Sequence, residues 1–156
     1  MLKKQIISIY NLKPLEMVFH HHLKNVETLV LKDSKMKKPI IIDKKNKIIL
    51  DGSHRYAFLY KNGYKLAPVL EVDYLNESIF VGNHLHHRFL YDSSKKITKE
   101  EVVKRGLSGK LYKPRTTRHF FPFRKIDYPT NLAILTSIII LVTSLSYILF
   151  PYLWKD

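Results

Sequence analysis

Short apolar runs alternate with segments of helical periodicity along the first 127 residues. Runs rich in Ile, Leu and Val, each bounded by turn residues, predict short strands. These predicted strands are residues 6–9, 39–43, 47–50 and 67–74. Residues 22–31 and 56–62 instead place apolar side chains three and four positions apart, as amphipathic helices do. The alternation predicts an α/β (α+β) domain built around a small mixed sheet.

A third helix is predicted by its start signal. Thr98 and Glu101 form the Thr-x-x-Glu pattern of a capping box, so we expect a helix from Thr98 to about Arg105. The stretch that follows contains two glycines and two prolines. Such residues favour irregular backbone, and we therefore predict a loop that carries residues 116–119.

The C-terminal part has a different pattern. Leu132 to Phe150 is a run of 19 residues without a charge, which spans roughly 28 Å as a helix. That length is close to the thickness of a bilayer's hydrocarbon core, and Tyr128 and Trp154 flank the run as interfacial anchors would. A buried core or dimer helix is the alternative. We predict two parts: a domain over residues 1–127 and a single-pass membrane anchor over residues 128–156.

The charge around the apolar run predicts an orientation. Basic residues precede the run, whereas only Lys155 follows it before the end of the sequence. The positive-inside rule then places the N-terminal domain on the cytoplasmic side of a membrane.

Composition narrows the chemistry. The formal net charge is +14, from 27 Lys and Arg against 13 Asp and Glu, which favours nucleotides, nucleic acid or an anionic membrane face as partners. The sequence contains no cysteine, so disulfides, thiolate metal sites and cysteine nucleophiles are excluded.

One junction predicts a phosphate site. The strand at 47–50 ends in Asp51-Gly52, and Ser53-His54-Arg55 opens the next helix. The first amides of a helix lack intrahelical partners, and with His54 and Arg55 beside them they suit a phosphate group. Simpler interpretations stay open: Asp51 as the helix N-cap, Arg55 in a surface ion pair and His54 as a packed histidine.

The order of these residues resembles the "DGHHR" element of the ParB/sulfiredoxin superfold. Two further runs look like free L-serine kinases. Pro114 and Thr116-Thr117-Arg118-His119 are similar to their "PKTTRH" run, and Lys13-Pro14-Leu15-Glu16 is similar to their "KPHE" run. Ser53 and Leu15 each stand where that family has a histidine. The matches keep the family's order and cover roughly residues 8–125.

The resemblance implies phosphorylation of free L-serine to O-phospho-L-serine, with Mg²⁺ and either ATP or ADP as donor. It implies that Glu16 is the general base and that Asp51 orients Mg²⁺ or the attacking hydroxyl. We expect the catalytic and phosphate-binding side chains to converge on one cleft. The implied phosphate-binding residues are Gly52, Ser53, His54, Arg55, Thr116, Thr117, Arg118 and His119. No metal site made by the protein alone is predicted, and the histidine-rich stretches are interpreted as solvated.

Two other functions remain open at this point. A membrane-tethered ParB-like module could bind nucleotide or DNA without catalysis, since the superfold hosts both activities. Nucleic acid is the less favoured partner, because no helix-turn-helix pattern follows and a DNA groove gains nothing from Glu16. A degenerate member that binds nucleotide and regulates another process is the third hypothesis. The choice between ATP and ADP is left open.

Overall fold

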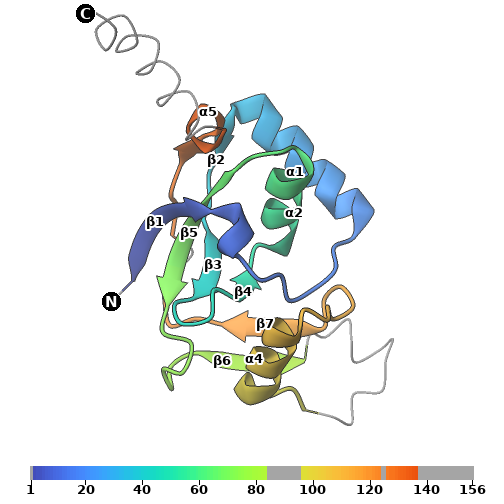
Figure 1. Ribbon diagram of the computed structural model, residues 1–156, viewed down its shortest axis with the longest axis vertical. Helices are drawn as coiled ribbons and strands as arrows, with labels where there is room; N and C mark the ends of the chain where they lie inside the picture. The colour runs from blue at the N-terminus through green and yellow to red at the C-terminus, as the bar shows by residue number, and fades with distance from the viewer. Residues whose placement is uncertain (1, 84–95, 124–125, 137–156) are drawn as a thin grey trace, which may run out of the picture.

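The computed structural model describes residues 2–83, 96–123 and 126–136. A four-stranded mixed sheet in the order β1–β5–β3–β4 forms its centre (Figure 1). β5 runs parallel to β3, whereas β1 and β4 are antiparallel to their neighbours. The strands are β1 (Lys3–Ser8), β3 (Ile40–Asp43), β4 (Ile49–Asp51) and β5 (Leu66–Val72). The predicted small mixed sheet is confirmed.

Helices and two small ladders complete the fold. One group comprises η1 (Ile9–Asn11), α1 (His20–Asp33), α2 (Ser53–Lys61) and α5 (Leu132–Leu135). The second comprises α4 (Lys99–Ser108), β6 (Phe80–Asn83) and β7 (Thr117–Phe120). Strands β2 (Lys35–Met36) and β8 (Thr130–Asn131) pair with each other, as do β6 and β7. Figure 1 shows α1 and α2 beside the upper part of the sheet and α4 with the β6–β7 ladder below it.

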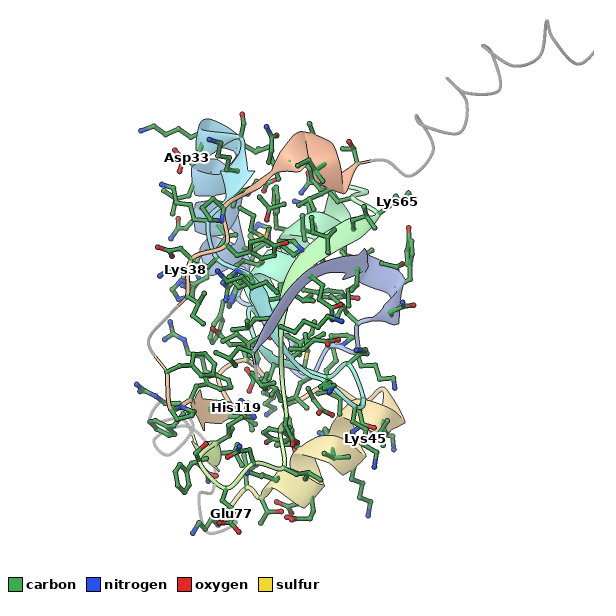
Figure 2. The ribbon with its side chains drawn as sticks, turned by 90° about the vertical axis from the view of Figure 1, so that its left-hand side faces the viewer. Asp33, Lys38, Lys45, Lys65, Glu77 and His119 are labelled. Atoms are coloured by element: carbon green, nitrogen blue, oxygen red, sulfur yellow. The ribbon has the colours of Figure 1, made fainter. Side chains whose placement is uncertain are left out.

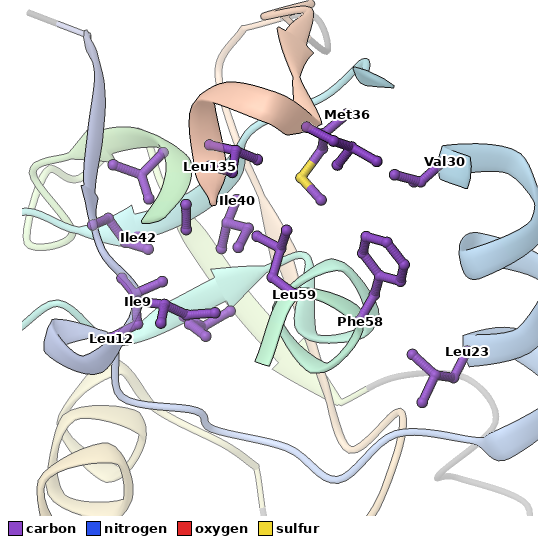
Figure 3. Close-up of a cluster of buried hydrophobic side chains, with 14 residues drawn as sticks. Ile9, Leu12, Leu23, Val30, Met36, Ile40, Ile42, Phe58, Leu59 and Leu135 are labelled. Atoms are coloured by element: carbon purple, nitrogen blue, oxygen red, sulfur yellow. The ribbon is translucent and has the colours of Figure 1, made fainter. Parts of the chain in front are cut away.

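The sheet separates two hydrophobic cores. Side chains alternate between the faces of a strand, so Ile40 and Ile42 join one core while Ile41 joins the other. The first core receives α1, α2 and α5, and Phe58 and Leu59 of α2 are completely buried there (Figure 3). Burial on both faces explains why these strands are continuous apolar runs in the sequence.

The second core draws α4 close to the sheet. Ile48, Leu70 and Val102 are buried in it at 1% exposure or less. A Cβ on Gly106 would lie 2.7 Å from Ile48 Cδ1, so only glycine allows this close approach of α4. The predicted capping box is confirmed: Glu101 N donates to Thr98 Oγ1 at 3.3 Å, and Thr98 N donates to Glu101 Oε2 at 3.2 Å.

The prediction of a loop at residues 116–119 is wrong for most of that segment. Residues 117–120 form β7, which pairs with β6 so that His119 lies opposite Val81. Gly109 ends α4 and Pro114 lies in the turn ahead of the strand, whereas Gly106 lies within α4 and Pro122 follows β7. The ladder fixes Thr117, Arg118 and His119 on a defined backbone instead of a loose loop.

The predicted membrane location is also contradicted. Leu132 and Leu135, at the start of the apolar run, are buried in the first core at 8% and 0% exposure, beside Met36 and Ile40 (Figure 3). The amide of Lys65 donates to the carbonyl of Leu135 at 3.1 Å. In the described part of the chain, no helix has the length and hydrophobicity that a bilayer span requires. The apolar run therefore begins as part of the globular core, and residues 137–150 lie outside the described residues.

Candidate functional site

A cavity of about 870 Å³ lies between α1, the β4–α2 turn and the segment 115–119, and it extends along α1 as far as Asp33. Its lining includes Glu16, although that residue is distant in sequence from the other predicted site residues. The predicted residues that line it are Glu16, Asp51, Gly52, Ser53, His54, Arg55, Thr117, Arg118 and His119. Thr116 does not belong to the lining: it is buried at 5% exposure, and its hydroxyl donates to the Lys113 carbonyl at 2.8 Å.

The β4–α2 turn exposes the start of a helix to this cavity. Gly52 has a φ of 101° and is the N-cap residue of α2, with no side-chain cap. The expectation that Asp51 caps this helix is wrong, because Asp51 is still part of β4 and its carboxylate instead pairs with Arg55. The first amides of α2 therefore have no partner within the helix and no capping side chain.

Arg55 is fixed from two sides. Its Nη1 donates to the carbonyl of Pro39 at 2.8 Å, and its Nη2 donates to Asp51 Oδ2 at 3.2 Å. A Cβ on Gly52 would lie 2.9 Å from Nη2 of Arg55, so the glycine provides room for the guanidinium as well as the left-handed backbone. Asp51 remains half exposed at the mouth of the cavity, with 50% of its side-chain surface accessible.

Glu16 lines the same cavity from another chain segment. The amide of Met17 donates to the Tyr112 carbonyl, and the amide of Tyr112 donates to the Leu15 carbonyl, both at 2.9 Å. Leu15 is buried at 1% exposure beneath them. These contacts pin the segment around Glu16 to the stretch that leads into β7.

The carboxylate of Glu16 is enclosed by donors from that stretch. Thr117 donates to Oε1 through both its amide and its hydroxyl at 2.6 Å, and the Arg115 amide donates to Oε2 at 3.2 Å. Arg115 has a φ of 57°, which is rare for a side chain other than Gly, Asn or Asp. Successive amides in such a conformation form a concave anion site. Burial raises the pKa of Glu16 above its usual value, although the hydrogen bonds from Thr117 and Arg115 oppose that shift.

His119 and Arg118 point their side chains to different surroundings. His119, labelled on β7 in Figure 2, has its Nε2 3.0 Å from the Tyr74 hydroxyl. Burial lowers the pKa of His119 to about 4, against a smaller raising effect of a backbone hydrogen bond with Leu50. The imidazole is therefore neutral at physiological pH. Arg118 is exposed and stacks over the Phe120 ring at 5.2 Å.

The structure adds residues that the sequence interpretation missed. His22, in the first turn of α1, has its ring 5.6 Å from that of His54, and Nη2 of Arg115 donates to His22 Nε2 at 2.7 Å. The triplet 20–22 was expected to be solvated, which holds for His20 and His21 but not for the half-buried His22. Its position one turn into an amphipathic helix, just before the apolar Leu23, was the available signal. Within the described ranges, no group of three His, Cys, Asp or Glu side chains is placed to hold a metal ion.

The sequence of the chain was compared with protein families and with characterised proteins. No protein-family model matches the chain. A ParB-like protein from Sulfolobus acidocaldarius is 42% identical over 57 residues, which is 36% of this chain and 28% of that protein. The chain thus matches less than a third of the length of this curated relative.

Solved structures extend the likeness over most of the chain. A free serine kinase in complex with AMP aligns with a TM-score of 0.73 at 19% identity, covering 85% of this chain and 93% of that one. A variant of a free serine kinase in complex with ADP aligns with a TM-score of 0.73 at 18% identity, with the same coverage. The resemblance predicted from the sequence is confirmed at the level of structure: the chain has the fold of free serine kinases, with a ParB-like match within it.

Proposed function

We propose that this chain is a small-molecule kinase that phosphorylates free L-serine to O-phospho-L-serine, with ADP or ATP as the donor. The observation that carries the proposal is that a carboxylate and a helix start with free amides line one cavity. A partly buried carboxylate, Glu16, lines the same cavity as the uncapped start of α2. A base and a phosphate cradle are the two parts that phosphoryl transfer to an alcohol needs.

Glu16 acts as the general base in this proposal. The serine hydroxyl gives its proton to the carboxylate while the hydroxyl oxygen forms a bond to the terminal phosphorus of the nucleotide. The bond from that phosphorus to its bridging oxygen breaks, and AMP leaves if the donor is ADP, or ADP if the donor is ATP. Burial raises the pKa of Glu16, which makes it a stronger proton acceptor than an exposed carboxylate.

The helix start supplies the phosphate contacts. Amides at the beginning of α2 donate to phosphate oxygens, and Gly52 lets those oxygens approach the backbone. The Arg55 guanidinium adds positive charge while its bond to the Pro39 carbonyl keeps it in place. The exposed Arg118 adds a second cation from β7.

The residues present also fit a magnesium ion carried by the nucleotide. Mg²⁺ prefers carboxylate and phosphate oxygens, and Asp51 offers a half-exposed carboxylate at the cavity. When bound, the ion would neutralise phosphate charge. In the structure itself, Asp51 orients Arg55 through their ion pair.

A regulatory nucleotide-binding module is the second hypothesis, and one observation favours it. Both oxygens of Glu16 accept hydrogen bonds from residues 115 and 117, so the carboxylate also has a structural role: it fixes the backbone that leads into β7. If this were its only role, the chain would bind nucleotide without transferring phosphate.

The deciding experiment incubates the full chain with Mg²⁺, serine and either ADP or ATP and detects phosphoserine by mass spectrometry. We expect serine-dependent phosphoserine with one of the nucleotides and its near loss in Glu16→Gln. Glu77→Gln is the matched control, because Glu77 is exposed at the lower end of the molecule in Figure 2 and does not line the cavity. Nucleotide binding without phosphoserine from either donor would favour the regulatory module.

A further inference from the structure

Three cationic or titratable side chains meet at one wall of the cavity although they come from separate segments. His22 belongs to α1, His54 to α2, and Arg115 to the turn before β7. The two imidazole rings contact each other edge to face with centroids 5.6 Å apart, and all three residues line the cavity. The sequence motif accounts for His54 alone.

The hydrogen bonds of this cluster fix its protonation. An arginine can only donate, so the 2.7 Å contact from Arg115 Nη2 makes His22 Nε2 an acceptor and His22 a neutral imidazole. The Nε2 atom of His54 is buried and has no hydrogen-bond partner among the residues that the structure describes. A buried polar atom without a partner is costly, which points to a ligand that completes the cluster.

Among the residues that the structure describes, no carboxylate pairs with the positive charge around the two histidines. The pKa of His54 is lowered by burial and by its cationic neighbours, and that of His22 by partial desolvation, His21 and Arg115. The nearby carboxylates are engaged elsewhere: Glu16 accepts from Thr117, and Asp51 pairs with Arg55. The charged or titratable groups facing the two rings are His21, Arg55 and Arg115.

We propose that His22, His54 and Arg115 bind one phosphate group together, and that the site takes up protons from solvent when that group binds. The inference rests on the proposed function, because the phosphate group is then the one that Glu16 helps to transfer. Arg115 joins the two parts physically, since its amide donates to Glu16 while its guanidinium contacts His22.

A phosphate group fits this cluster better than a carboxylate. It carries about −1.5 to −2 charges and three strong acceptor oxygens, which match two imidazolium rings and one guanidinium. Once protonated, His22 can no longer accept from Arg115, so both side chains turn their N–H groups to the ligand. A bound dianion thus replaces an internal hydrogen bond with charge-assisted ones.

The test is calorimetry of ADP binding to the full chain at pH 7, in two buffers with different ionisation enthalpies. We expect a measurable net uptake of protons by the wild type, up to a maximum of two, one for each histidine. His22→Gln should reduce that uptake and weaken ADP binding about 10- to 100-fold, as the loss of a charge-assisted hydrogen bond implies. His20→Gln is the control, since His20 lies on the same helix but is exposed and does not line the cavity.

Further measurements show which chemical group of the ligand the cluster binds. Adenosine should bind wild type and His22→Gln equally, because it carries no phosphate. His54→Gln should repeat the effect of His22→Gln, which guards against a folding defect in one variant. Serine binding weakened by His22→Gln with ADP binding unchanged would assign the cluster to a carboxylate and overturn the proposal. So would zero proton uptake by the wild type.

The outcomes also distinguish this inference from the proposed function. Phosphoserine formation by a protein whose His22→Gln variant keeps wild-type ADP affinity would refute the cluster and leave the kinase standing. Proton-linked ADP binding that depends on His22, without phosphoserine formation, would support the cluster and refute the kinase.

Discussion

The β4–α2 turn and the segment 115–119 line the same cavity but use their polar groups in opposite ways. At the turn, the scaffold holds Arg55 and leaves the start of α2 uncapped toward the cavity. In the segment, Thr116 bonds to Lys113, Thr117 bonds to Glu16 and His119 contacts Tyr74. The first region leaves backbone donors at a helix start, whereas Thr116, Thr117 and His119 of the second region bond to other protein groups. In this run, both hydroxyls and the imidazole have protein partners, and the role of the run in phosphate binding stays a prediction.

The largest effect should come from Glu16, which lines the cavity with both regions and accepts hydrogen bonds from residues 115 and 117. Glu16→Gln removes the base and should lower turnover by about 10²–10⁴-fold while leaving ADP affinity nearly unchanged, because the proposed phosphate ligands are other groups, namely the first amides of α2 and the side chains of His22, His54 and Arg115. Steady-state kinetics and calorimetry measure the two quantities. Full activity in the variant would show that Glu16 has only the structural role of holding residues 115–117 in place.

His119 should matter for stability instead of phosphate binding. Its pKa is about 4 in the folded state against about 6.5 when unfolded, so the unfolded chain binds more protons between these values. The stabilisation is complete above pH 6.5 and is lost as the pH falls towards 4, by on the order of 3 kcal/mol. Urea denaturation from pH 4.5 to 7 should show a shallower pH dependence for His119→Gln than for wild type.

The control for that experiment is Tyr74→Phe. This change removes the hydroxyl partner but leaves His119 buried, so most of the pH dependence should persist. His22 and His54, whose pKa values are also lowered, add a residual dependence to every variant. An unchanged slope in His119→Gln would mean that His119 is not the buried neutral group described here.

A substitution at Gly52 tests whether the β4–α2 turn contributes to ADP binding. Gly52→Ala places a Cβ at a φ of 101° and 2.9 Å from the Arg55 guanidinium, so it should cost roughly 2–3 kcal/mol of stability and weaken ADP binding. Gly63→Ala is the matched control: its φ is 75°, but nothing lies within 4 Å of the new Cβ. We expect roughly 1–2 kcal/mol and no change in ADP affinity there. Equal effects of the two variants on ADP binding would refute a phosphate site at the start of α2.

Thr117 gives the smallest effect. Thr117→Val removes one donor to Glu16 while keeping the backbone amide, so the pKa of Glu16 should rise. Because the ionised carboxylate is the base, the acidic limb of the pH–rate profile should move to higher pH. Thr117→Ser should restore the wild-type profile. A weaker affinity for ADP in Thr117→Val, without the pH shift, would instead assign Thr117 to the phosphate.

The contrast also explains how far the sequence could lead. Apolar periodicity predicted the sheet correctly because strands such as 40–43 are buried on both faces and leave a clear signal. The sequence identified Asp51 to Arg55 as residues of the cavity, because these residues are consecutive and follow a predicted strand. His22 and Arg115 were missed because their contact brings the first turn of α1 beside the turn before β7, and these two segments are far apart in the sequence.

The wrong predictions of a membrane span and of an Asp51 N-cap also arose because local sequence does not show the tertiary contacts of a residue. The apolar run from Leu132 resembles a membrane span, yet its first turn fills the domain core, and hydrophobicity alone does not distinguish lipid from a protein interior. Asp51 is a favoured N-cap residue type, but its pairing with Arg55 prevails in the structure.

A crystal structure of the chain with ADP would test the central claim most directly, because it shows which region holds the phosphate. We predict that the terminal phosphate contacts the first amides of α2 and the side chains of His22, His54 and Arg115, within reach of Glu16. A terminal phosphate held by Thr117 and His119 with the start of α2 empty, or a nucleotide outside the cavity, would contradict this account.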